Sequence, residues 1–303
     1  MKTSIFRFIL IVGLVFTSAI VSGVRGQTAN GVRLNNMSVR APVGVGQECL
    51  IGGFVIQKQC QLLIRAVGRS LQGFGIRNTC NDPKLQIFSG SIVVAENDNW
   101  GGVAEITAAA SRVGAFSIPA GSLDAVVLVT LPAGIYSAVV TSNDAVPGGI
   151  ALLEIYDTSP SSDGFYNQSV RAIAGYGESA LIMGVVVSGT GPASFLFRGI
   201  GPGLAPFGVT KYLFDPLLTL RDELGNLIDR NDSWGTMFSN FYFGRWGAFP
   251  LPEGSTDAAI IFESGFFGGG PTSSIRFTAI VESKSEGVSG PVLAECYFVP
   301  RFF

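Results

Sequence analysis

The chain has 303 residues, of which 47% are hydrophobic and only 14% charged, and it contains no histidine. The missing imidazole excludes Ser-His-Asp and Cys-His catalysis and histidine-ligated zinc chemistry within this chain. A formal net charge of −2 and a pI of about 5.3 exclude nucleic-acid binding driven by a basic surface, so we expect no nucleic-acid partner.

Residues 1–26 have the pattern of a signal peptide. Lys2 and Arg7 supply the positive start, residues 9–21 form an apolar run, and a small residue precedes a cleavage point ahead of Gln27. The run is slightly short for a membrane anchor, which needs about 20 apolar residues. We therefore expect a protein with no transmembrane span after cleavage, secreted or at the cell surface, in a bacterial periplasm or outside the cell.

The four cysteines all follow the predicted cleavage point, so they would reach a compartment that permits disulfides. Four cysteines allow three pairings, and the sequence does not choose among them. The positions are Cys49, Cys60, Cys80 and Cys296.

The rest of the chain is an internal repeat with a spacing of about 133 residues. Residues 38–41 return as 169–172, 63–68 as 196–201, 97–101 as 231–235, 114–116 as 247–249 and 153–156 as 294–297. A polar stretch rich in Ser, Pro and Gly, residues 158–164, has the composition of a linker. We assign residues 31–157 to a first repeat and residues 165–303 to a second, and the length suits two domain cores better than one.

Short apolar runs bounded by Gly, Pro, Asn or Asp predict the strands of a β-sandwich. In the first repeat they cover residues 50–56, 62–67, 85–88, 92–95, 126–131, 136–140 and 150–156. Several are apolar throughout, which is typical of strands covered on both faces or lying at a seam between domains. The Ala-rich residues 103–115 predict one short helix, and their counterpart, residues 238–246, is aromatic. The predicted fold class is all-β: two tandem jelly-roll-like β-sandwich domains, each with at most one short helix.

A polar turn precedes a tryptophan in each repeat, and two interpretations of it stay open. Side-chain oxygens packed in a tight loop suit Ca²⁺, with Asp82 and Asp215 as further candidate ligands. Alternatively, the same side chains stabilise a turn while the tryptophan closes the end of the sandwich. Calcium is the one cofactor that we expect as a possibility, at Asn97, Asp98, Asn99, Asn231 and Asp232.

Two arginines and two glutamates interrupt otherwise apolar strands. A charge on such a strand is usually paired or reaches the rim of the sheet. We predict one ion pair in each repeat, Arg65 with Glu154 and Arg198 with Glu295, with a structural role. No nucleophile or base accompanies them in the sequence, so we expect no catalytic residue.

The second repeat is rich in aromatic residues. Aromatic faces bind sugar rings or partner surfaces, although the same residues can simply fill a core. The candidate ligand-binding residues are Phe238, Phe241, Tyr242, Trp246, Phe266 and Phe267.

Residues 215–232 resemble the bacterial pre-peptidase C-terminal domain family, whose pattern runs from an Asp-Pro strand through a turn to an Asn/Asp pair. Residues 131–136 (Leu-Pro-Ala-Gly-Ile-Tyr) are similar to that family's next strand, and the second repeat departs from it at residues 266–271. The resemblance covers about half of each repeat. It implies a non-catalytic jelly-roll-like sandwich that accompanies exported proteins and is sometimes stabilised by calcium, here carried over only to Asn97, Asp98, Asn231 and Asp232.

Duplicated units favour avidity or polymerisation over catalysis. The sequence therefore predicts a non-enzymatic exported protein that acts in binding, adhesion or assembly at the cell surface or outside the cell. Its partner would be an extracellular protein, a polysaccharide or a second copy. The alternatives are a carbohydrate-binding module and a glycoside hydrolase that uses a facing pair of carboxylates.

Overall fold

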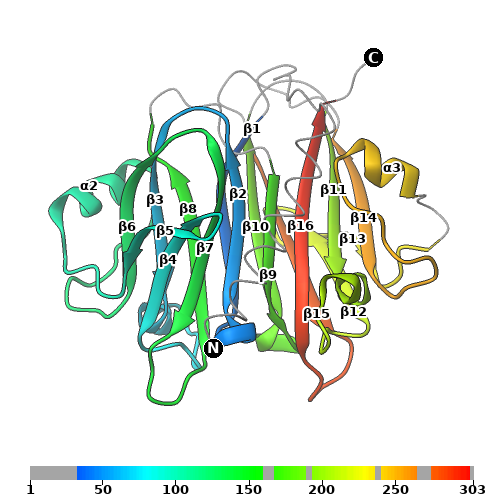
Figure 1. Ribbon diagram of the computed structural model, residues 1–303, viewed down its shortest axis with the longest axis horizontal. Helices are drawn as coiled ribbons and strands as arrows, with labels where there is room; N and C mark the ends of the chain where they lie inside the picture. The colour runs from blue at the N-terminus through cyan, green and yellow to red at the C-terminus, as the bar shows by residue number, and fades with distance from the viewer. Residues whose placement is uncertain (1–32, 160–166, 189–192, 236–239, 265–273, 301–303) are drawn as a thin grey trace.

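The computed structural model describes residues 33–159, 167–188, 193–235, 240–264 and 274–300. They form two antiparallel sheets of eight strands each, with short helices at the two flanks (Figure 1). The all-β sandwich predicted from the sequence is confirmed. No helix among the described residues has the length and hydropathy that a membrane crossing requires.

Each repeat contributes eight strands and one α-helix. In the first repeat these are β1 (Arg33–Pro42), β2 (Leu50–Ile56), β3 (Cys60–Val67), β4 (Pro83–Ser89), β5 (Ile92–Asn97), α2 (Ala104–Arg112), β6 (Ala125–Leu131), β7 (Gly134–Ser142) and β8 (Ile150–Asp157). In the second they are β9 (Asn167–Ala174), β10 (Leu181–Ser188), β11 (Ala193–Ile200), β12 (Pro216–Arg221), β13 (Leu227–Asn231), α3 (Asn240–Arg245), β14 (Ala258–Ser264), β15 (Ser274–Ser283) and β16 (Gly290–Pro300).

Each repeat has jelly-roll connectivity. In the first, one sheet runs β1-β8-β3-β6 and the other runs β2-β7-β4-β5. The second repeat gives the same pattern when its strands are counted from β9, as β9-β16-β11-β14 and β10-β15-β12-β13. In each repeat the consecutive strands cross from one sheet to the other, except that β4 and β5, and likewise β12 and β13, form a hairpin within one sheet, which is the arrangement of a jelly roll.

The two repeats are joined strand to strand. Strand β1 pairs with β10, and β2 pairs with β9, so both sheets run through the whole molecule (Figure 1). The residue partners in these two strand pairs are reciprocal, as they would be if a two-fold axis related the repeats. Ser38 lies opposite Gly184, and its counterpart Ser169 lies opposite Gly53, the counterpart of Gly184. Arg40 and Arg171 face Ile182 and Ile51 in the same reciprocal way. This is the self-complementary contact of a two-fold dimer built into one chain.

The expectation of two separate cores is therefore wrong. One cluster of buried side chains runs from Leu34 in β1 to Cys296 in β16 and includes residues of both repeats. The physical reason is that β1, β2, β9 and β10 would each leave a row of unpaired backbone groups at the edge of an isolated sandwich. Pairing across the repeat boundary satisfies those groups and makes the cores continuous.

Most predicted strands match the observed ones, and the helix predicted at residues 103–115 appears as α2. Strand β1 was not among the predicted runs. Its buried residues are Leu34, Met37, Val39 and Ala41, and a bulge between Leu34 and Asn36 shifts their alternation by one residue. The shift disguises the period-2 pattern on which strand prediction relies.

The four cysteines are buried and unpaired, so the expected disulfide is not formed. Each occupies an apolar position whose counterpart in the other repeat is an aliphatic residue: Ala180 for Cys49, Ala193 for Cys60, Leu213 for Cys80 and Ile155 for Cys296. Burial raises the pKa of the Cys60 and Cys80 thiols to about 11, and it raises those of Cys49 and Cys296 as well. The cysteines act as small hydrophobic residues.

These thiols should stay unreactive and uncrosslinked in the folded protein. A thiol-specific reagent should titrate four thiols after unfolding and almost none before it. A reductant should leave the melting temperature unchanged. A melting temperature that falls on reduction, or fewer than four titratable thiols in denaturant, would contradict this structure.

Candidate functional site

The outer face of each sheet carries a buried arginine. On β3, Ile64 points into the common core, and Arg65 points to the opposite side, where the segment between β5 and β6 covers it. Arg198 on β11 occupies the corresponding position in the second repeat. Their exposed fractions are only 1% and 0%, which is unusual for a charged side chain.

Each arginine is paired with the glutamate predicted for it. Arg65 donates from Nε to Glu154 Oε2 at 2.9 Å and also bonds that oxygen through Nη2, and Arg198 does the same with Glu295 at 2.9 and 2.5 Å. The second carboxylate oxygen accepts a hydrogen bond from a tyrosine hydroxyl, Tyr156 at 2.7 Å or Tyr297 at 2.9 Å. The predicted pairing is confirmed in both repeats.

The covering segment is tied to the same arginine. Nη1 of Arg65 donates to the Phe116 carbonyl at 2.6 Å, and the guanidinium carbon lies 4.4 Å from the centre of the Phe116 ring. Arg198 repeats both contacts with Phe249, again at 2.6 and 4.4 Å. A satisfied network of this kind fastens the covering segment to the sheet.

The two tyrosines of the network are held in their neutral form. Burial, followed by the nearby Glu154, raises the pKa of Tyr156, and burial, followed by the nearby Glu295, raises the pKa of Tyr297. Both tyrosines are therefore neutral hydrogen-bond donors at physiological pH. The glutamates accept bonds from arginine and tyrosine, and no nucleophile lies in either network among the described contacts.

Replacing one partner of the Arg198–Glu295 pair should lower the free energy of unfolding far more than replacing both partners together. The variant Arg198→Met leaves the Glu295 carboxylate buried and uncompensated, so it should lower the free energy of unfolding by about 3–5 kcal/mol. The double variant Arg198→Met with Glu295→Leu should recover much of that loss in denaturant titrations. Additive losses in the double variant would show that the two side chains are not energetically coupled.

Sequence analysis missed a second pair of buried acids, Asp124 and Asp257. Asp124 Oδ1 accepts a bond from the Gly68 amide at 2.7 Å, and Asp257 Oδ1 accepts one from the Gly201 amide at 2.8 Å. A side chain at either glycine would place its Cβ 2.1 or 1.8 Å from a carbonyl oxygen, Cys80 or Leu213 respectively. The repeat of Ser-x-Asp-Ala at residues 122–125 and 255–258 was the available signal.

One of the differences between the two covering segments changes how the space beside the buried arginine is filled. Beside Arg65 the first repeat has a cavity of about 230 Å³, with Ala110 of α2 in its wall and Trp100 and Val126 among its lining residues. The corresponding residue in α3 is Phe243, which is fully buried, with its ring 5.2 Å from the Arg198 guanidinium carbon and 5.5 Å from the Trp234 ring. The site is thus open in one repeat and filled in the other.

The Asn/Asp turns before the tryptophans are held by their own side chains. Asn97 donates from Nδ2 to the Asn99 carbonyl at 3.0 Å, and its Oδ1 accepts a bond from the Val126 amide at 2.9 Å. Asn231 makes the same two bonds, with the Ser233 carbonyl and the Ala259 amide. The amide oxygens of Asn97 and Asn231 thus each accept a hydrogen bond from a backbone donor, which favours the turn interpretation for these two residues.

The remaining acids at this end of the molecule are arranged differently in the two repeats. Lys284 places its ammonium 2.5 Å from Asp215 and 3.1 Å from Asp232. Asp82 and Asp215 each have a buried Oδ1 with no hydrogen-bond partner among the described residues, but in the first repeat Asn143 stands where the second has Lys284. In the described part of the chain no group of three or more Cys, Asp or Glu side chains is arranged to hold a metal ion.

Asp82 should therefore give the fold a pH dependence. Burial, then Asp144 and Asp98, raise its pKa above the usual value, so the folded state binds this proton more tightly than the unfolded chain does. Ionised Asp82 is destabilising, and the penalty fades as pH falls through its folded pKa. Asp82→Asn should raise the melting temperature by about 1–2 °C at pH 7, with no gain below about pH 4.

Asn143→Lys supplies the ammonium found in the second repeat and should stabilise at pH 7 as well. A melting temperature that does not respond to either change, or a gain that persists at pH 3, would show that Asp82 carries no such penalty.

Only two of the six predicted aromatic ligand residues, Phe241 and Trp246, have side chains among those that the structure describes, so the predicted site stays a prediction. Phe238, Phe266, Phe267 and the side chain of Tyr242 lie outside the described residues. Phe241 is 69% exposed, whereas Trp246 is partly buried against the cluster that contains Phe243. Among the described members, the aromatic-rich segment thus fills a local core and presents Phe241 to solvent.

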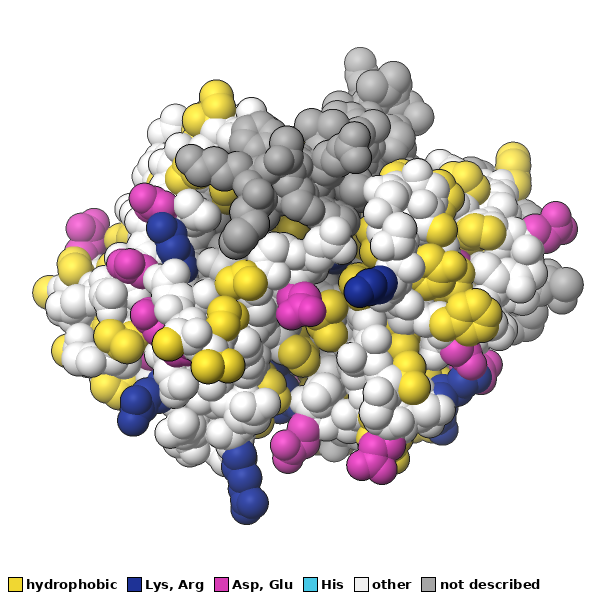
Figure 2. Space-filling view, turned by 60° about the horizontal axis from the view of Figure 1, so that its bottom comes forward, with side chains coloured by type: hydrophobic (Ala, Val, Ile, Leu, Met, Phe, Trp, Pro, Cys, Tyr) yellow, Lys and Arg dark blue, Asp and Glu magenta, His cyan; other side chains and the backbone are white. Residues whose placement is uncertain are grey.

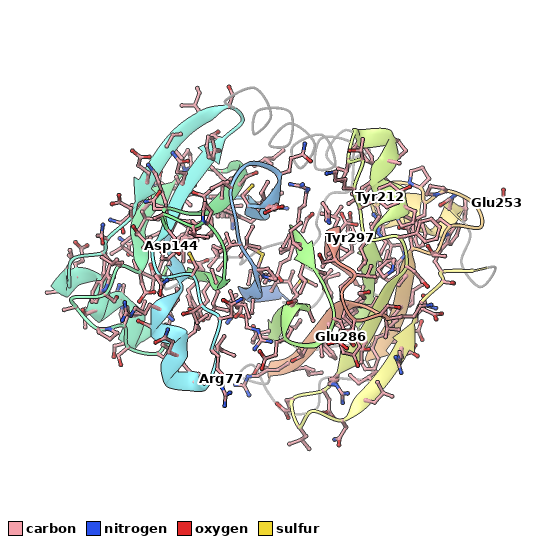
Figure 3. All side chains as sticks on the ribbon, turned by 90° about the horizontal axis from the view of Figure 1, so that it is seen from below. Arg77, Asp144, Tyr212, Glu253, Glu286 and Tyr297 are labelled. Carbon is pink, nitrogen blue, oxygen red and sulfur yellow. The ribbon has the colours of Figure 1, made fainter. Side chains whose placement is uncertain are left out.

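Charged groups are dispersed over the face of the molecule seen in Figure 2. Figure 2 shows small groups of hydrophobic side chains on one face, with acidic and basic side chains scattered among them. From below, Asp144 lies in the first repeat, whereas Glu286 and Glu253 lie at different places in the second (Figure 3). These three carboxylates do not form the facing pair that a glycoside hydrolase needs.

No family model matches the chain, and no curated protein matches it. Two similar solved structures are the tandem family 51 carbohydrate-binding modules of a glycoside hydrolase from Streptococcus pneumoniae and the major capsid protein P2 of bacteriophage PM2. Both are 8% identical, with TM-scores of 0.23 and 0.21, and the matches cover 82% and 89% of this chain and 83% and 98% of the other.

A third similar structure is the enzymatically active domain of tailspike protein 4 from bacteriophage CBA120. It is 12% identical with a TM-score of 0.21, and the match covers 43% of this chain and 15% of that one. Likenesses this weak carry no argument about function. The resemblance to the pre-peptidase C-terminal domain stays a prediction.

Proposed function

We propose that this is an exported, non-enzymatic protein that works by binding and assembly at the cell surface or outside the cell. The observation that carries the proposal is a pair of aliphatic hairpins at opposite ends of the joined sheets. Strand β5 is the last strand of one sheet, and β13 is the first strand of the other. In the described residues each pairs with a single neighbour, β4 or β12.

Both hairpins expose apolar side chains. Ile92, Val93 and Val94 of β5 are 67%, 42% and 42% exposed. At the other end Leu224 is 81% and Leu227 57% exposed. An edge strand with unpaired backbone groups and aliphatic side chains is a template for pairing with another strand.

The internal two-fold relation gives the molecule two such ends. A unit with two equivalent binding ends can form linear assemblies or bind a repetitive surface with avidity. The dispersed charge and the fully bonded Arg–Glu networks also support a role that depends on surfaces instead of a reaction centre. The predicted signal peptide supports export, and residues 1–26 lie outside the described structure.

A charge on the edge strand should weaken self-association. The variant Val93→Lys places an ammonium on β5 and should raise the dissociation constant of self-association, measured by sedimentation equilibrium, at least about tenfold. Val146→Lys is the matched control, since Val146 is 85% exposed and lies outside the strands. A wild-type protein that stays monomeric at every concentration, or an equal effect of both variants, would contradict assembly through β5.

A further inference from the structure

We propose that the first repeat contains a binding site for a single aromatic ring, in the cavity between α2 and the outer face of β3 and β6. The cavity has a volume of about 230 Å³. An apolar cavity of about 150 Å³ already accepts benzene, so one ring with a small substituent fits this space.

The cavity has a buried floor and a polar rim. Arg65, Trp100 and Val126 line the floor and are at most 6% exposed. The exposed Thr107, Ser111 and Ser117 also line the cavity and bring three hydroxyl groups to it. A ring would thus lie against apolar and aromatic surface, and a polar substituent on it would meet the hydroxyl groups.

The second repeat shows what this space accommodates. The backbone establishes the correspondence, because the Ala115 amide bonds the Ala110 carbonyl at 2.9 Å and the Ala248 amide bonds the Phe243 carbonyl at 3.0 Å. Arg198 and Trp234, the counterparts of Arg65 and Trp100, both contact the Phe243 ring. In the second repeat the protein's own phenyl ring, that of Phe243, therefore fills the space that is open in the first.

The electrostatics favour a neutral aromatic ligand. The Glu154 carboxylate already balances the charge of Arg65, so the site does not require an anion. A guanidinium beside a ring face attracts the π electrons, as Arg65 already does with Phe116 at 4.4 Å. An aliphatic ligand would gain the burial of its surface without this attraction, so the class of ligand is a monocyclic aromatic with a hydroxyl or similar polar group.

Phenol is a suitable probe, and its binding can be followed by ligand-observed NMR and calorimetric titration. We expect saturable binding of one phenol per chain and NOEs from its ring protons to the Ala110 methyl group and the Trp100 indole. Ala110→Phe supplies the ring covalently, as Phe243 does, and should weaken phenol binding at least about tenfold. Ala108→Phe is the matched control, because Ala108 lies on the exposed side of the same helix, and it should leave binding unchanged.

The reverse exchange tests the same inference from the other side. Phe243→Ala empties the second site and should raise the stoichiometry to two phenols per chain. Absence of saturable binding to the wild type up to about 10 mM phenol would overturn the proposal, as would equal losses in Ala110→Phe and Ala108→Phe. The NOEs in the wild type decide the question even where a variant does not fold, since NOEs only to other residues would place phenol elsewhere. This site does not depend on assembly through β5, so either proposal can fail alone.

Discussion

The pairing of β1 with β10 and of β2 with β9 is the constraint on which the rest of this structure depends. Without it, each repeat would be a small sandwich with two more exposed edges of unpaired backbone groups than it has in the joined sheets. With it, every strand near the centre has two neighbours and one core serves both repeats. The serine and glycine residues opposite one another at the seam, Ser38 with Gly184 and Ser169 with Gly53, allow the two halves to meet with little steric bulk.

Because β1 pairs with β10 and β2 with β9 at the centre, features in which the two repeats differ lie at the periphery. Strands β1, β2, β9 and β10 lie at the centre of the sheets, whereas the covering segments and the outermost hairpins lie at the flanks (Figure 1). The same Arg–Glu–Tyr network fastens both covering segments, which shows that this part of the duplicated unit is structural. Two differences between the repeats lie at the periphery: Ala110 where the other repeat has Phe243, and Asn143 where it has Lys284.

The proposed ring site rests on one of those local differences. The network found in both copies holds each covering segment to its sheet, whereas the cavity beside Arg65 belongs to the first copy. Ala110 lines that cavity, and the Phe243 ring occupies the corresponding position in the second repeat. The edge hairpins are a different case, because their position at the two ends follows from the topology, and both copies retain aliphatic residues there.

Much of this protein follows from the sequence by itself. The repeat, the short strands, the helix α2 and the Arg65–Glu154 and Arg198–Glu295 pairs were all predictable, because each rests on local periodicity or on the cost of burying a single charge. The seam was not predictable, because β1 breaks its alternation at a bulge and strand pairing between repeats leaves no local pattern. The fate of the cysteines and the cavity depended on tertiary structure for the same reason: whether a thiol meets another thiol, or an alanine leaves a space, is decided by which side chains the fold brings opposite it.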